Sequence, residues 1–184
     1  MINEFFSNIK LSKIDNRYQK GFTLLELIIV FTVIALLSTV GVASFVDYSR
    51  VQIIQTAASN LESTLNMAKS RALSQTKPSG CNGILQGYEV VLDTVSNPNS
   101  YAIWAICPGV SIDPVNPFSA TNKTVLPSSI SFDTTNTTTY SIFFPIITSG
   151  VRGAGNIVLK GYNQSRWICV GSGGIVKISS SGCL

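Results

Sequence analysis

The chain has 184 residues, about the size of one domain, with 45% apolar residues, 12% charged residues and a formal net charge of +4. It contains no histidine, which excludes Ser-His and Cys-His catalytic pairs, and no Cys-x-x-Cys spacing that would indicate a zinc site. The carboxylates of its C-terminal part are dispersed, so we expect no enzyme, no metal or cofactor site and no small-molecule substrate.

The first 21 residues form a polar, basic segment that precedes an apolar one. An ordinary secretory signal places its cleavage site after the apolar region, so the order here is the reverse. Basic residues near a membrane helix stay in the cytoplasm, which predicts a cytoplasmic N-terminus and an exported C-terminal part. The basic residues of this segment are Lys10, Lys13, Arg17 and Lys20.

The apolar segment predicts a single membrane-spanning helix. Residues 27–46 carry no charge over twenty positions, long enough to cross a hydrocarbon core of about 30 Å. We therefore assign residues 22–46 to the transmembrane half of a long helix. Glu26 lies at its edge, where a carboxylate is costly unless it has a partner.

The same helix is predicted to continue as an amphipathic half over residues 47–77. No proline interrupts the chain between Phe22 and Thr76, and Pro78 with Gly80 is expected to end the helix. The apolar stripe could form a coiled-coil seam, but packing on the domain that follows is favoured. The stripe consists of Val51, Ile54, Ala58, Leu61, Leu65, Ala68 and Ala72.

Residues 78–184 are predicted to form a β-rich globular domain, which makes the fold α+β. Pro145 predicts an edge strand or a bulge, and the Thr/Asn run at 134–139 predicts a polar loop. Trp104 and Trp167 lie in strand-like runs and are expected on sheet faces or in the core. The predicted strands are residues 87–93, 101–107, 130–133, 140–147, 156–160, 167–170 and 175–179.

All four cysteines lie on the predicted exported side, where disulfides persist. Two predicted hairpins could bring Cys81 near Cys107 and Cys169 near Cys183, and we favour these two disulfides over free thiols. Four cysteines allow three connectivities, and the sequence leaves the choice open.

The stretch Gly21-Phe22-Thr23-Leu24-Leu25-Glu26-Leu27 closely resembles the class III signal of type IV pilins and pseudopilins. The resemblance implies that a prepilin peptidase removes the leader, residues 1–21, by cutting after Gly21, and methylates the new amine of Phe22. It further implies a long N-terminal helix, an inner-membrane assembly platform, and assembly with other pilins through the Phe22 amine and Glu26. The filament would be a type IV pilus or a type II secretion pseudopilus. An anchored protein that never polymerises is the alternative.

Shorter stretches resemble the GspH/FimT group of minor pilins and pseudopilins. These are residues 67–74, 87–90 and 174–178, and they imply a C-terminal β-sandwich-like domain and a place near a fibre tip. Some FimT proteins bind DNA through a Gly-Arg-x-Arg pattern. Here Gly174 keeps the glycine, but Ile175 and Lys177 replace the two arginines.

A basic C-terminal part leaves DNA binding during natural transformation as an alternative function. No acidic residue follows Asp133, and the loop at 150–155 is rich in glycine and could approach a phosphate backbone. That loop lacks the Lys-Ser/Thr of a nucleotide-binding P-loop. Scattered solvating charges are the favoured interpretation. The candidate DNA contacts are Arg152, Lys160, Arg166 and Lys177.

Overall fold

The computed structural model describes residues 21–78, 81, 83–107, 123–147 and 150–183, and only the helical backbone of residues 39–43. The leader residues 1–20, with the four basic residues named above, lie outside the described residues. The chain divides into two compact units, Met1–Ala43 and Ser44–Leu184, and each is described by itself.

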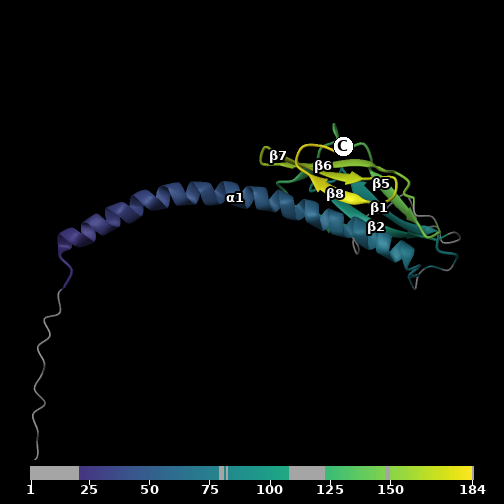
Figure 1. The fold of residues 1–184 in the computed structure, drawn as a ribbon, viewed down its shortest axis with the longest axis horizontal. Coiled ribbons are helices and arrows are strands. Elements are labelled where there is room, and N and C mark those ends of the chain that lie inside the picture. The colour runs from purple at the N-terminus through teal and green to yellow at the C-terminus, as the bar shows by residue number, and fades with distance from the viewer. Residues whose placement is uncertain (1–20, 79–80, 82, 108–122, 148–149, 184) are drawn as a thin grey trace, which may run out of the picture. The chain divides into compact units, whose positions relative to one another are not determined.

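One helix, α1 (Leu24–Leu73), spans 50 residues and runs through both units (Figure 1). It ends four residues before the predicted boundary at 77. Gln75 adopts a positive φ of 50°, its N–H bonds the carbonyl of Ala72, and the N–H of Thr76 bonds the carbonyl of Arg71. This pair of hydrogen bonds is a Schellman C-cap, so a local backbone turn stops the helix before Pro78 does.

Within the part of the chain that the structure describes, no helix reaches the length and hydropathy needed to cross a membrane.

The second unit contains two antiparallel four-stranded sheets. In the first sheet the order is β3-β2-β1-β5, so β5, which ends in Pro145, is an edge strand as predicted. Its strands are β1 (Gly87–Asp93), β2 (Ser100–Ile106), β3 (Lys123–Val125) and β5 (Ser141–Pro145). In the second sheet the order is β4-β6-β7-β8, with β4 (Ser131–Phe132), β6 (Gly155–Gly161), β7 (Gln164–Val170) and β8 (Val176–Ser179).

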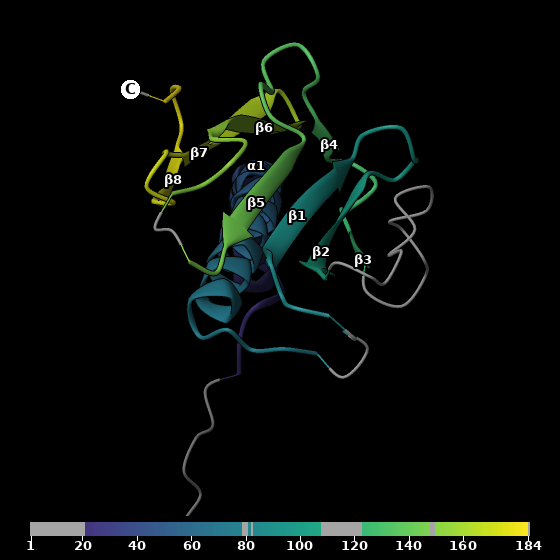
Figure 2. The ribbon, with the colours of Figure 1, turned by 90° about the vertical axis from the view of Figure 1, so that its right-hand side faces the viewer.

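The amphipathic half of α1 packs on these sheets, which confirms the predicted α+β arrangement. Six stripe residues from Ile54 to Ala72 are fully buried, while Val51 is half-buried. They share one core with Val90 and Ile142 of the first sheet and with Ile157 and Ile168 of the second. Figure 2 shows the two sheets side by side next to α1.

Both predicted disulfides are present, with Cα–Cα distances of 5.8 Å for Cys81–Cys107 and 5.6 Å for Cys169–Cys183. The first joins the segment before β1 to the residue after β2. The second joins β7 to the chain beyond β8. No described cysteine is free.

Candidate functional site

The N-terminal motif begins α1 with a side-chain cap. The hydroxyl of Thr23 accepts a hydrogen bond from the backbone N–H of Glu26 at 3.2 Å, and the carbonyl of Thr23 accepts one from Leu27 at 3.2 Å. Thr23 is therefore the N-cap and Glu26 the third helical residue, the Thr-x-x-Glu spacing of a capping box. A carboxylate in the first turn also interacts favourably with the positive end of the helix dipole. Sequence reasoning missed this capping role, although the spacing itself was a usable signal.

Neither residue at the predicted cleavage site is held by packing. A Cβ added to Gly21 would meet no atom within 4 Å, so steric crowding gives no reason for glycine at this position. The side chain of Phe22 is 83% exposed. This segment is therefore accessible to another protein.

The first stretch of α1, residues 24–38, displays apolar side chains in all directions, and all of its described side chains are exposed. Apart from Glu26, its polar side chains are Thr32 and Ser38. Their hydroxyls donate to the carbonyls of Ile29 and Ile34, at 2.8 Å and 2.7 Å. Polar groups that turn back onto their own helix suit an environment without water.

The four candidate DNA contacts do not form one patch. Arg152 lies beside β5, where its guanidinium carbon is 5.5 Å from the centroid of the Phe143 ring. Arg166 in β7 pairs with Leu159 in β6, so both side chains lie on the face of the sheet that packs on α1. Its Nε donates to Gln55 Oε1 at 2.8 Å.

The two lysines occupy the opposite face of the second sheet. Strand register puts Lys160 of β6 beside Ser165 and Lys177 of β8 beside Cys169, and these two partners are four residues apart on β7. Lys160 Nζ is 3.8 Å from Asp133 Oδ1, whereas Lys177 is exposed. Three of the four basic side chains thus have contacts inside the chain.

The glycine-rich segment at 150–155 is held in place rather than free. Arg152 pairs with Phe143 in a β-bridge, and Gly153 has a φ of +80°. A Cβ on Gly153 would lie 2.1 Å from the carbonyl oxygen of Ser141, and one on Gly155 would lie 2.6 Å from Thr138 Oγ1. These glycines allow close packing, which corrects the expectation of a loop free to approach phosphates.

The region that resembles the Gly-Arg-x-Arg pattern is also packed. Gly174 is buried with a φ of +71°, and its carbonyl accepts a hydrogen bond from Lys69 Nζ of α1 at 2.7 Å. Ile175 beside it is exposed. This hydrogen bond holds the turn before β8 against α1.

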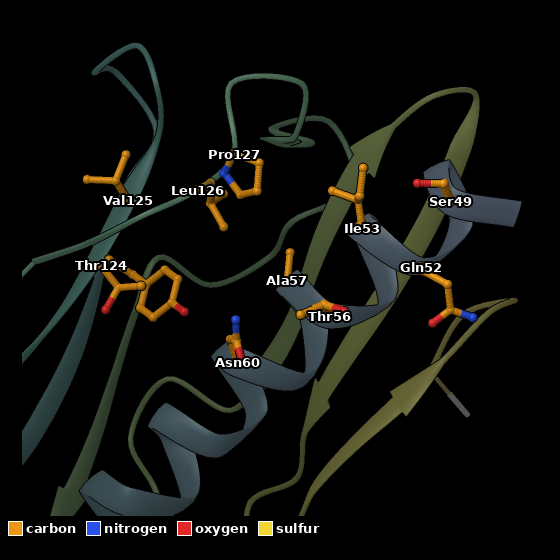
Figure 3. Close-up of a pocket in the computed structure, with 11 residues that line it drawn as sticks. Ser49, Gln52, Ile53, Thr56, Ala57, Asn60, Thr124, Val125, Leu126 and Pro127 are labelled. Carbon is orange, nitrogen blue, oxygen red and sulfur yellow. The ribbon is translucent and has the colours of Figure 1, made fainter. Parts of the chain in front are cut away.

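A cavity of about 290 Å³ lies between α1 and the chain after β3 (Figure 3). Ile53 and Ala57 lie on one side, and Leu126 and Pro127 on the other. Among the described residues, none that lines it is charged. Tyr101 borders it. Burial raises the pKa of Tyr101, and hydrogen bonds with the Thr64 and Thr124 side chains oppose that rise.

Two aspartates with lowered pKa values, Asp133 and Asp93, stabilise turns. The Asn136 amide holds the pKa of Asp133 below its usual range, helped by the Thr135 amide and Lys160, although burial opposes this. Partial burial raises the pKa of Asp93, but hydrogen bonds from Ser96 and Val95 outweigh it and lower the pKa. Among the described residues, no group of three or more metal-ligand side chains is placed to hold an ion.

Both tryptophans are half-buried on strands, in agreement with their predicted sheet-face positions. The indole N–H of Trp104 is buried and has no hydrogen-bond partner.

Comparison with known proteins supports the N-terminal motif. Residues 16–42 match the family described as the prokaryotic N-terminal methylation motif. No solved structure matches the chain. The matched residues contain the cleavage site, the helix cap and Glu26, and they begin the helix that packs on the antiparallel sheets. This match supports the resemblance of the N-terminal segment to the class III signal of type IV pilins and pseudopilins.

Proposed function

We propose that this protein is a minor pilin or pseudopilin of the GspH/FimT type, which is processed by prepilin peptidase and assembles into a type IV pilus or a type II secretion pseudopilus. The single observation that carries the proposal is the start of α1. The predicted cut lies two residues before the helix begins, and Glu26 sits in the first turn. The role is structural, not enzymatic.

The chemistry of the cut explains why a carboxylate belongs at this position. Cleavage after Gly21 creates an α-amine on Phe22 that stays cationic after one methylation. A cation at the N-terminal end of a helix is repelled by the helix dipole, so it needs an anionic partner. Glu26 lies four residues, or about one turn, further on and supplies that charge within one subunit or between neighbours.

The proposed location follows from the sequence. The uncharged run at 27–46 anchors the protein in the inner membrane, with the N-terminus in the cytoplasm and the domain outside. Two disulfides suit an oxidising compartment on the exported side. The neighbouring genes would identify the machine, because pilus, secretion and competence filaments share the N-terminal motif.

Glu26→Ala tests the proposal in cells that contain a prepilin peptidase. We expect normal cleavage and methylation by mass spectrometry, but at least a tenfold loss of incorporation into sheared filaments. Glu62→Ala removes another α1 carboxylate and should incorporate normally. An uncleaved N-terminus in the unaltered protein, or normal incorporation of Glu26→Ala, would refute the proposal.

A second control separates charge pairing from helix capping. Thr23→Ala removes the cap, at a cost of about 1 kcal/mol, but keeps the carboxylate. If Thr23→Ala loses as much incorporation as Glu26→Ala, the glutamate acts by starting the helix and not by pairing with the amine.

No comparable structural observation supports a function in DNA uptake. The basic side chains lie apart, and Arg166 and Arg152 have contacts with Gln55 and Phe143. A salt-sensitive electrophoretic shift of DNA that is lost on neutralising Lys160 and Lys177 would revive this function.

A further inference from the structure

The cavity of about 290 Å³ beside α1 lies at the edge of the first sheet. Among the described strands, β3 pairs with β2 alone and is the last strand of its sheet. Thr124 and Val125 of β3 border the cavity on one side, and residues of one face of α1 border it on the other (Figure 3). We call this cavity, together with the edge of β3, the β3 groove.

The backbone of β3 carries hydrogen-bonding groups on its outer edge. The N–H of Leu126 donates to the carbonyl of Asn99 at 2.8 Å, so these two residues continue the β2–β3 ladder as a hydrogen-bonded pair. Such pairs alternate along an antiparallel ladder, which makes the pair that contains Thr124 the next one. The backbone N–H and carbonyl groups of Lys123 and Val125 therefore point away from β2. The described residues offer these groups no hydrogen bond, and an edge of this kind is a template for another strand.

Polar side chains of α1 border the same groove. Gln52, Thr56 and Asn60 are exposed and follow one another at four-residue steps, which places them in one row along the helix. Each of these side chains can both donate and accept a hydrogen bond, and none is engaged by another described residue. The row is about 12 Å long. That is the length of about three to four residues of extended chain.

Apolar side chains form the inner wall of the groove. Ala57 and Leu126 are buried, Ile53 is half-buried, and no described residue of the lining is charged. A charged group that entered this wall would lose its hydration without gaining an ion pair. The groove therefore favours a neutral occupant that offers small apolar side chains on one side and backbone hydrogen-bonding groups at its edges.

We propose that the β3 groove binds an extended, uncharged segment of another protein, which adds a strand to the free edge of β3. Successive side chains of a strand point to opposite sides, so every second residue of the segment places a β-branched apolar side chain against Ile53 and Ala57. Pairing with β3 supplies affinity, and the apolar wall selects the side chains. The row on α1 hydrogen-bonds the peptide groups that point away from β3.

This binding site is independent of the assembly function proposed above. All of its residues lie in the unit Ser44–Leu184, whereas the cleavage site and Glu26 lie in the other unit. A failure of peptide binding leaves N-terminal processing and filament incorporation untouched. A failure of processing likewise leaves the β3 groove untouched.

The test uses the full chain in detergent micelles and a fluorophore-labelled, capped peptide of alternating threonine and valine, acetyl-Thr-Val-Thr-Val-Thr-Val-Thr-amide. Fluorescence polarisation should show saturable binding. One control peptide carries N-methyl groups on its valine amides and a second carries them on its threonine amides. One of the two should bind at least tenfold more weakly, because N-methylation blocks pairing along one edge. A peptide with glutamate in place of valine should also bind at least tenfold more weakly.

Variants of the chain locate the binding. Val125→Pro removes the outward N–H of an edge strand, a position at which proline is tolerated, and should weaken binding at least fivefold. Thr56→Ala combined with Asn60→Ala should weaken it at least threefold. Ser59→Ala alters an exposed α1 residue outside the groove lining and should leave binding unchanged. Urea midpoints from tryptophan fluorescence check that each variant is folded.

Amide hydrogen exchange, measured by NMR, reports strand pairing directly. The N–H of Val125 points away from β2, so its exchange should slow at least fivefold when the peptide is bound. The N–H of Thr124 already points toward β2 and is the matched control, whose exchange should change little.

Several results would overturn the proposal. These are no saturable binding at millimolar peptide, equal binding of both N-methylated peptides and the parent, and exchange of Val125 that is unchanged on binding. An equal loss of binding in Ser59→Ala would also overturn it. Competition by the neutral disaccharide maltose would assign the groove to a sugar. Slowed exchange of Val125 on raising the protein concentration without peptide would assign the edge to a second copy.

Discussion

The two stretches of α1 bury their apolar side chains in different ways. In residues 24–38 every described side chain is exposed, although nearly all are apolar. In residues 44–73 a narrow stripe is fully buried against two sheets, and the exposed positions are mostly small or polar. A helix that is apolar on all sides can bury its side chains only in surroundings outside its own chain. An amphipathic helix buries its apolar stripe against its own domain.

This contrast indicates a division of labour within one continuous helix. The second stretch contributes to the stability of the domain. Under the proposed function, the first stretch contributes to anchoring and to contacts with other subunits. Changes in the two stretches should therefore have separable effects, and the following predictions test that separation.

The largest effect is expected from a matched pair of leucine truncations. Leu61 is 0% exposed and Leu37 is 69% exposed. Leu61→Ala should lower the free energy of unfolding by about 2–5 kcal/mol, because it leaves a cavity in the core. Leu37→Ala should leave that free energy unchanged. Trp104 and Trp167 both lie in the domain, so tryptophan fluorescence during urea unfolding of the detergent-solubilised chain reports on it. Equal losses of unfolding free energy in the two variants would contradict the separation of roles between the two stretches of α1.

Loss of either disulfide should also act on the domain alone. The bonds close loops with sequence separations of 26 and 14 residues, and each should contribute about 3 kcal/mol. Replacing both members of one pair by serine should lower the urea midpoint but not prevent N-terminal cleavage. Loss of cleavage in these variants would show that processing depends on the folded domain.

A smaller effect is expected from acid. Because the pKa of Asp133 is lowered by folding, its contribution is complete above the unfolded value of about 3.9 and is lost as the pH falls below it. Urea midpoints should fall as the pH drops below about 4, and less steeply in Asp133→Asn than in the unaltered chain. An unchanged slope in the variant would assign the acid sensitivity to other groups.

The smallest effect is expected from the hydrogen bond between Arg166 and Gln55. Gln55→Ala should cost about 1 kcal/mol in unfolding free energy, because it removes an acceptor from a half-buried guanidinium. Arg166→Gln should have a similar cost. If Arg166→Gln instead leaves stability unchanged and weakens binding of DNA, the arginine belongs to a nucleic-acid site.

Patterns that repeat along the chain could be predicted well. The buried stripe of α1 follows from spacing alone, and β1 matches the predicted residues 87–93. Other strands differ from prediction by a few residues at their ends. β3 was missed, because three residues without apolar alternation form a strand only by pairing with β2. The end of α1 depends on one residue, Gln75, in a conformation that its side chain does not signal.

The candidate basic site could not be predicted, because it depends on which face each side chain occupies. Register sets that face. Placing Arg166 opposite Leu159 turns it toward α1, while Lys160, one residue further along β6, faces the other way. Likewise the position of Arg152 follows from its bridge to Phe143, which lies nine residues earlier in the chain. Composition alone indicates an excess of positive charge but not its arrangement.

The bond between Cys169 and Cys183 also sets the path of mechanical load. Tension applied at the C-terminus passes from Cys183 directly to β7, because the covalent link bypasses the turn and β8 between them. The edge strand β8 therefore cannot be peeled away from the chain end, as it could be in a reduced domain. A domain pulled through Cys183 would yield only when β7, an inner strand of its sheet, is torn out.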